Sequence, residues 1–172
     1  MDESLNVSAI QALAEQGDAD AQYKYGWELC NADLPKKDWG LPMHWFRKAA
    51  EQGHPKGLWK VGGSFEQIDN EQAVYWYRKS AEAGYPTAQW WLGVKYLIGD
   101  GVAQDYEQAY FWFKVAAEGG DPDASRELGA MCEIGEGVAQ NWQHSSFWYK
   151  IAAIQCSDLL RDRSNKPITV AN

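Results

Sequence analysis

The sequence predicts an all-α protein, a solenoid of about four helix-turn-helix repeats with a capping helix at each end. Two observations carry this prediction. A short string recurs along the chain at a nearly constant interval, and each interval holds two stretches whose apolar residues follow helical spacing. Internal repeats of this length are typical of stacked helical hairpins. Nowhere does the chain alternate apolar and polar residues as a half-buried strand would.

The interval is marked by the string Ala-Glu-x-Gly. It ends at four glycines, Gly17, Gly53, Gly84 and Gly120. These glycines lie 36, 31 and 36 residues apart, so one unit is five residues shorter than its neighbours. A second string, Gly-x-Gly-Val-Ala-Gln, begins at Gly99 and again at Gly135. Alignment of the units places the missing residues after Gly62.

The first helical stretch of each unit has the pattern small-x-x-x-apolar-Gly-x-x-apolar. Its first residues are Ala21, Gly57, Ala88 and Ala124. Residues with these spacings share one face of a helix. A glycine inside a helix costs about 1 kcal/mol relative to alanine. Its recurrence therefore indicates a position where another helix must approach closely.

The second helical stretch carries two adjacent aromatic residues, then a basic residue and two small residues. The aromatic pairs are Trp45-Phe46, Trp76-Tyr77, Trp112-Phe113 and Trp148-Tyr149. Aromatic residues at one position of every unit are expected to pack between neighbouring hairpins. We expect the same burial for Trp39, Tyr106 and Trp142, which align just before each second helix.

The connectors between these stretches favour helix ends. Within a unit, Gly-Asp-Gly-Val-Ala-Gln-Asp supplies a glycine for a left-handed helix end and Asp105 as the N-cap of the next helix. Between units, Pro86 and Pro122 follow a helix-ending glycine and begin the next helix. We therefore expect one domain over residues 1–164 and a flexible tail over 165–172. Its parts are an N-terminal cap at about 5–16, repeats at about 21–53, 57–84, 88–120 and 124–156, and a C-terminal cap at about 157–164.

The unit from Ala88 to Gly120 resembles the SEL-one-like repeat, a relative of the tetratricopeptide repeat. It matches nearly every position of the pattern A-x-x-x-L-G-x-x-Y-x-x-G-x-G-V-x-x-D-x-x-x-A-x-x-W-x-x-x-A-A-E-x-G. The last unit departs from it at Asn141 and Cys156, and the first unit lacks the Gly-x-Gly of the connector. The resemblance extends from about Ala9 to Cys156. It implies a right-handed α/α superhelix used for protein–protein interaction, in adaptors, bacterial regulators, inhibitors and immunity proteins that share no catalytic residues.

Composition excludes several functional classes. The chain has 16 Lys and Arg against 24 Asp and Glu, a net charge of −8, which argues against a nucleic-acid partner. It has no apolar run long enough to span a membrane, and its N-terminus lacks the basic start and apolar core of a secretory signal. We therefore expect a cytoplasmic protein with no membrane partner. Three cysteines without regular spacing are expected to be free thiols.

Two tryptophans depart from the repeat pattern and mark a candidate binding surface. Trp91 aligns with charged residues of the other units, and Trp27 aligns with small or medium-sized ones. A tryptophan at an otherwise charged position is expected to face solvent, where tryptophan often anchors a partner. In the tetratricopeptide-like proteins that the chain resembles, first helices line a concave groove. The candidate groove comprises Lys24, Trp27, Lys60, Trp91, Lys95 and Glu127. The alternative is that both tryptophans fill local gaps caused by the shortened connector.

The sequence indicates no catalytic or metal site. His44, His54 and His144 fit no metal-ligand spacing, and we expect no cofactor. The favoured function is non-enzymatic: an adaptor or regulator that binds a protein or peptide in the concave groove, and the negative charge favours a basic partner. The alternative is an immunity or inhibitor protein that neutralises a toxin or enzyme. A hydrolase is less favoured, because Glu127 and Glu133 do not share a helical face. We expect a monomer or a weak homodimer joined through the solenoid ends.

Overall fold

The computed structural model describes residues 3–31 and 39–164. Within these ranges the chain forms nine α-helices and no strand. In chain order they are α1 (Glu3–Glu15), α2 (Ala19–Asn31), α3 (Gly40–Glu51), α4 (Pro55–Gly63), α5 (Asn70–Glu82), α6 (Pro86–Ile98), α7 (Tyr106–Glu118), α8 (Pro122–Ile134) and α9 (Trp142–Ser164).

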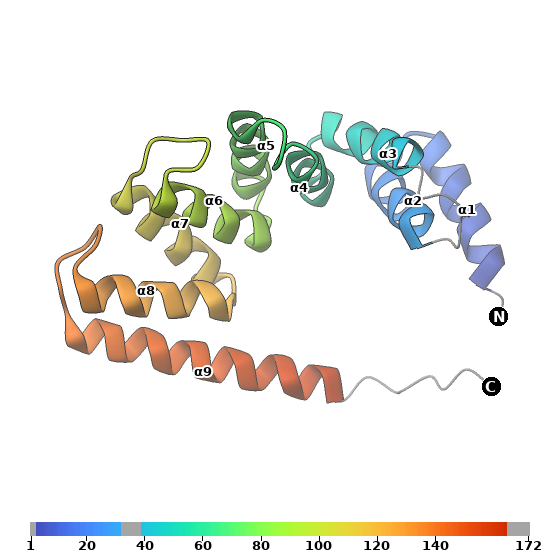
Figure 1. The fold of residues 1–172 in the computed structure, drawn as a ribbon. Coiled ribbons are helices and arrows are strands. Elements are labelled where there is room, and N and C mark those ends of the chain that lie inside the picture. Colours follow the sequence, from blue (N-terminus) through green and yellow to red (C-terminus); the bar gives the residue numbers. More distant parts are fainter. Residues whose placement is uncertain (1–2, 32–38, 165–172) are drawn as a thin grey trace.

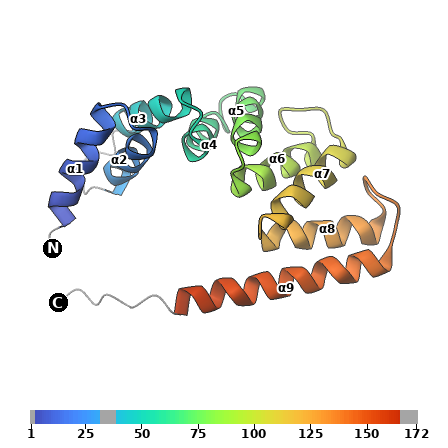
Figure 2. The same cartoon turned by 180° about the vertical axis from the view of Figure 1, so that it is seen from behind.

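The helices pair into hairpins that stack along an arch (Figure 1). The first helix of a repeat lies toward the inside of the arch and the second toward its outside, most plainly for α2 below α3 and α8 above α9. Seen from behind, α9 runs past the end of α8 and back toward the side of the arch where α1 and α2 lie (Figure 2). The predicted all-α superhelical solenoid of helix-turn-helix repeats is confirmed.

At the N-terminal end, α1 takes the place of a second helix that has no first helix in the described chain. The buried side chain of Gln22 on α2 donates a hydrogen bond to the Ala14 carbonyl at 3.2 Å. Gln89 on α6 makes the same bond to the Ala81 carbonyl at 3.1 Å, between two complete repeats. The stacking of α1 on α2 thus follows the geometry of the later repeats.

At the C-terminal end, α9 is the longest helix of the described chain, with 23 residues. It continues without interruption through residues 157–164, so this segment extends the last helix rather than forming a separate capping helix. The expected tail, 165–172, lies outside the described residues.

The recurring glycine in each first helix makes room for an aromatic ring of its partner helix. A methyl group added at Gly93 would lie 2.7 Å from the ring of Phe113, closer than van der Waals contact permits. At Gly62 it would lie 2.7 Å from the ring of Tyr77. Each helical glycine is therefore retained because any larger residue would force the two helices of the hairpin apart.

The predicted caps form as expected. The Asp105 carboxylate accepts a hydrogen bond from the Gln108 backbone N–H at 3.0 Å at the start of α7. Gly99 ends α6 with φ of 74°, in the left-handed region where a side chain would be strained. His54 caps α4 in the same way as an aspartate would, because its Nδ1 accepts from the Gly57 N–H at 3.1 Å.

The aromatic pairs of the first and third repeats are buried in the core, as is Tyr77 of the second, but Trp76 and Trp148 are half-buried and Tyr149 is 38% exposed, so the predicted burial is wrong for Tyr149. It is also wrong for two of the residues just before the second helices. Phe46 and Phe113 are 1% and 0% exposed, respectively. Trp39 and Trp142, however, are 55% and 61% exposed, so the predicted burial is wrong for both. Tyr106, at the equivalent position, is half-buried and packs against the main core. The exposure of this position depends on whether the connector of the following repeat covers it. Where that connector is short, the candidate site opens.

Candidate functional site

A full-length connector covers the start of the second helix in the preceding repeat. In the third repeat, Gly101 packs so tightly on Asn70, at the start of α5, that a methyl group would overlap the Asn70 carbonyl. The neighbouring Asp100 carboxylate accepts a hydrogen bond from the Asn70 side-chain amide at 2.6 Å. In the fourth repeat, Gly137 packs equally closely on the Tyr106 carbonyl at the start of α7. The equivalent position in the first repeat is Trp39.

The shortened connector of the second repeat folds differently. It turns back at once after α4, with the Ser64 hydroxyl donating to the Val61 carbonyl at 2.7 Å and the Asp69 N–H to the Phe65 carbonyl at 2.8 Å. It has neither the Gly-x-Gly nor the length of the later connectors. Trp39 therefore remains exposed, and a pocket opens beside it.

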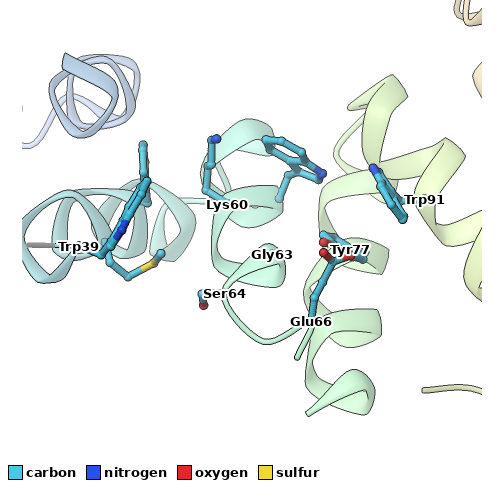
Figure 3. A pocket seen from close by; sticks show the side chains of 10 residues that line it. Trp39, Lys60, Gly63, Ser64, Glu66, Tyr77 and Trp91 are labelled. Atoms are coloured by element: carbon cyan, nitrogen blue, oxygen red, sulfur yellow. The ribbon is translucent and has the colours of Figure 1, made fainter. Parts of the chain in front are cut away.

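This aromatic pocket has a volume of about 430 Å³. Its lining comes from four consecutive helices, α3 to α6, and from the shortened connector. The lining residues are Trp39, Met43, Phe46, Trp59, Lys60, Gly63, Ser64, Glu66, Tyr77 and Trp91. Figure 3 shows Trp39 and Trp91 on opposite sides, with Lys60 at one edge and Glu66 at the other. Mostly aromatic walls with few polar groups are typical of binding sites, and this volume lies within their usual range of roughly 300–1,000 Å³.

Lys60 is the positive group of the pocket. Its ammonium group lies 4.6 Å from the ring centre of Trp27 and 4.7 Å from that of Trp59. Among the described residues no carboxylate forms an ion pair with it. Burial lowers the pKa of Lys60 below its usual value, because the charged form is partly removed from water. Two aromatic rings thus hold a half-buried cation whose charge is not neutralised by a carboxylate.

Glu66 is the negative group of the pocket, and another side chain of the same protein lies against its carboxylate. The Tyr77 hydroxyl lies close to its carboxylate (Figure 3). Burial and this neighbouring carboxylate raise the pKa of Tyr77 well above its usual value, so the phenol stays neutral. The two charged edges of the pocket therefore differ, because Glu66 has the Tyr77 hydroxyl close by and Lys60 has only aromatic rings.

The structure brings together three of the six predicted groove residues. Lys60 and Trp91 line the pocket, and Trp27 contacts Lys60 through its ring. Lys24 is exposed on α2, one turn before Trp27. Glu127 is half-buried on α8 and does not line the pocket.

Lys95, the sixth predicted residue, is not available to a partner. It is 5% exposed, and its ammonium group lies 2.6 Å from the Asp100 carboxylate. Asp100 belongs to the connector that closes over α5, so Lys95 holds this connector in place. The sequence placed Lys95 on the groove because a lysine on an inner helix is usually solvated; the ion pair with the connector is what allows its burial.

Sequence reasoning missed four lining residues that matter to the pocket: Trp39, Trp59, Glu66 and Tyr77. The first was assigned to the core from its alignment. The sequence shows that the second unit lacks five residues, but the effect of this loss on the preceding second helix is visible only in the structure. Trp91 is half-buried rather than fully facing solvent, and it lines the same pocket as Ser64 and Glu66 of the shortened connector.

The outer face carries a second aromatic feature that the sequence reasoning did not single out. Tyr75, Phe111 and Phe147 occupy one position of successive second helices and are 47%, 51% and 52% exposed. The Phe111 ring lies edge-on to Trp112, with ring centres 5.1 Å apart. We call these three residues the outer aromatic row.

The described ranges hold neither a metal-binding cluster nor a membrane-spanning helix. No group of three His, Cys, Asp or Glu side chains there is placed to bind a metal ion. No helix in the same ranges combines the length and the apolar character that crossing a membrane requires.

The chain matches a known repeat family along most of its length. The family model of the Sel1 repeat matches residues 19–54, 59–85, 86–121 and 122–155. These matches begin and end close to the repeats expected from the sequence. The comparison with curated proteins returned no match.

Solved structures share the fold. The protein c5321, a protective antigen of uropathogenic Escherichia coli strains with an SLR fold, is 34% identical with a TM-score of 0.80 over 89% of this chain and 35% of its own. A Sel1 repeat protein from Oxalobacter formigenes is 33% identical with a TM-score of 0.74, over 85% of this chain and 44% of its own. This chain therefore spans less than half the length of either protein. The immunity protein Pa5087 from Pseudomonas aeruginosa is 22% identical with a TM-score of 0.59, over 87% and 57% of the two chains, and shares the fold alone.

Proposed function

This chain belongs to the Sel1 repeat family, and from that premise we propose that it is a non-enzymatic adaptor or regulator that binds a protein or peptide on the inner surface of the arch. Sel1 repeat solenoids are in general interaction scaffolds rather than enzymes. The observation that carries the proposal is the aromatic pocket, whose lining combines Trp59, Trp91 and Lys60 from two inner helices. Tryptophan anchors surrounded by polar groups are characteristic of binding surfaces.

The inner surface also has the rigidity that binding favours. Its helices are fixed by the core beneath them, where Leu92 and Leu128 are fully buried. A surface that is already ordered loses little conformational entropy when a partner binds. A partner that contacts Lys24, Trp27 and the pocket would therefore meet side chains that are already held in place before binding.

Site-specific photo-crosslinking tests this proposal. Benzoylphenylalanine is introduced at Lys24 or Trp91 on the inner surface, and separately at Phe111 of the outer aromatic row, in cells that make the protein. We expect a discrete crosslinked protein from the two inner positions and none, or a different one, from Phe111. The same crosslinked protein from the outer position alone would reject the inner surface as the binding face.

The proposal is also tested with a variant that alters the inner surface and a matched control that leaves it intact. Trp27→Ala/Trp91→Ala is compared with Trp142→Ala, which removes an equally large side chain that is 61% exposed at the far end. Circular dichroism first establishes that all three proteins are helical. Loss of the crosslink from Lys24 in the double variant, and its retention in Trp142→Ala, is the expected result.

A finer alternative is an immunity or inhibitor role. The observation that favours it is the net charge of −8, because an acidic inhibitor associates faster with a basic toxin or enzyme. Stopped-flow association with the crosslinked partner at several salt concentrations distinguishes the two roles. An association rate that falls steeply with salt, together with loss of the partner's activity in the complex, favours the inhibitor.

We propose that the protein is a monomer or a weak homodimer joined end to end. On α7, Ala116 and Ala117 are 0% and 2% exposed, because the next hairpin covers them. The equivalent Ala153 on α9 is exposed, since no described helix lies beyond it. Sedimentation velocity over a range of concentrations tests this, and substitution of Ala153 by Glu is expected to remove any dimer.

A further inference from the structure

We infer that the aromatic pocket receives a large apolar side chain of the partner, and that Lys60 pairs with a carboxylate next to that side chain in the partner's sequence. This inference rests on the proposed function, because it assumes a protein or peptide partner. It names the chemistry of the segment that binds, which the family and the fold leave open.

The walls of the pocket favour a large apolar side chain. Trp39, Trp59 and Trp91 come from three different repeats and converge on one cavity of about 430 Å³. Trp39 is 55% exposed, although it lies beside the buried Phe46 of the same hairpin. A surface of this composition gains most from burial against an aromatic or bulky aliphatic group, because the hydrophobic contribution grows with the apolar area removed from water.

The ammonium group of Lys60 favours a carboxylate on the partner. Lys60 is half-buried, lies against the rings of Trp27 and Trp59 and has no carboxylate partner in the described chain, whereas Glu66 lies close to the Tyr77 hydroxyl. A partner carboxylate would give Lys60 a charge-assisted hydrogen bond in a partly desolvated site, where such bonds are strong. A partner cation would instead be repelled by Lys60. Lys24, exposed one turn before Trp27 on α2, adds a second positive group on the same side.

The positive charge at the pocket edge is compatible with the negative net charge of the whole protein. The net charge of −8 acts over long distances and is screened beyond about 8 Å at physiological salt. The contact itself is decided by the groups at the pocket edge. A partner that is basic overall is therefore compatible with a binding segment that is locally acidic.

The size of the pocket limits how far apart the apolar residue and the carboxylate can lie in the partner's sequence. Lys60 and the three tryptophans line the same cavity, and residues of an extended peptide are about 3.3 Å apart. The carboxylate is therefore expected within about two residues of the apolar anchor. The partner class is a peptide segment, free or within a protein, in which Trp, Phe, Tyr, Leu or Met stands beside Asp or Glu.

The experiment selects peptides from a random library displayed on phage, using the full chain as bait. The same selection is made against Lys60→Glu, Lys60→Met and Lys150→Glu, the last being an exposed lysine of α9 outside the pocket. We expect peptides selected on the unaltered protein to combine a large apolar residue with a nearby Asp or Glu. Lys60→Glu is expected to select Arg or Lys at that place, Lys60→Met to lose the charge preference only, and Lys150→Glu to select as the unaltered protein does.

Binding of the best synthetic peptide is then measured by fluorescence polarisation. Lys60→Glu and Trp91→Ala are each expected to weaken it by at least about tenfold, and Lys150→Glu and Trp142→Ala by less than about twofold. A further variant restores the missing connector by inserting the Leu97–Gly101 segment after Phe65, and is expected to abolish binding by covering Trp39. Thermal unfolding of each variant shows that it is folded.

Three outcomes would overturn the inference: enriched peptides without acidic residues, binding unaffected by Lys60→Glu and Trp91→Ala, or no enrichment above the starting library. Each leaves the proposed function standing if the inner positions still crosslink a protein partner in cells. Loss of that crosslink, with peptide binding at the pocket retained, would instead reject the proposed partner surface and keep the pocket as a peptide site.

Discussion

Gly101 lies directly against the backbone carbonyl of Asn70, thirty-one residues earlier in the chain, and a methyl group at Gly101 would overlap it. Through this contact the connector of one repeat closes over the start of a second helix in the preceding repeat. Gly101 also has φ of 73°, in the left-handed region. The position therefore excludes side chains for two independent reasons, the backbone conformation and the lack of space.

Gly101→Ala is accordingly expected to destabilise the protein more than the same change at Gly84. Gly84 has φ of 86° but no atom within 4 Å of an added methyl group, so only backbone strain of roughly 1–2 kcal/mol is expected there. Overlap with Asn70 should add about 1–3 kcal/mol at Gly101. Urea unfolding followed by circular dichroism measures both, and equal losses would show that the connector does not press on α5.

The ion pair between the buried Lys95 and the partly exposed Asp100 should be more strongly coupled than a pair on the surface. Asp100→Asn leaves the buried Lys95 without its charge partner and is expected to cost about 1–3 kcal/mol, whereas Lys95→Met leaves a carboxylate that water still reaches and is expected to cost less. The double variant should recover most of that loss. The exposed pair Lys114–Glu118, with its charged atoms 3.9 Å apart, is the control and should show a coupling free energy below about 0.5 kcal/mol. Similar coupling free energies in the two cycles would contradict the structural role assigned to Lys95.

Asp121 should contribute to stability as a helix cap but not through its charge. Its carboxylate accepts from the Ala124 N–H at 2.9 Å, so Asp121→Ala should cost about 1 kcal/mol, whereas Asp121→Asn keeps the bond. Burial raises the pKa of Asp121 above its usual value. The folded protein therefore binds this proton more tightly than the unfolded chain, and that stabilisation is lost as pH rises through the raised pKa.

The stability of Asp121→Asn relative to the unaltered protein is accordingly expected to increase as pH is raised from about 3 to 6. Chemical unfolding at a series of pH values gives the difference directly. A difference that decreases over this range would mean that the ionised carboxylate is favoured in the folded state.

Trp112 and Trp142 should respond very differently to truncation. Trp112 is 9% exposed within the main core, and Trp112→Ala is expected to cost about 3–5 kcal/mol. Trp142 is 61% exposed, and Trp142→Ala should change stability by no more than about 0.5 kcal/mol. Thermal and urea unfolding compare the two. A large loss in Trp142→Ala would mean that its side chain is covered in solution, for example by a second copy of the chain.

The repeats themselves could be predicted from the sequence because their determinants are local or periodic. A helical glycine recurs where an aromatic ring of the partner helix must fit, as at Gly93 and Phe113. Asp105 stands where a helix begins and Gly99 where one ends. These features act within one hairpin. The residues of a single unit and their repetition are therefore sufficient to identify the order of inner helix, connector and outer helix.

The pocket could not be predicted, because it depends on contacts between different repeats. The sequence showed that the second connector is short, but only the tertiary structure shows that a connector covers the start of the preceding second helix. The loss after Gly62 therefore exposes Trp39 in the repeat before it, and the burial of Lys95 depends on Asp100 in a connector of normal length. The residues of each unit indicate its two helices, their caps and their order along the chain, although segment 157–164 proves to extend α9. The stacking of the repeats decides which tryptophans and lysines remain accessible, because exposure depends on what neighbouring repeats place over a residue.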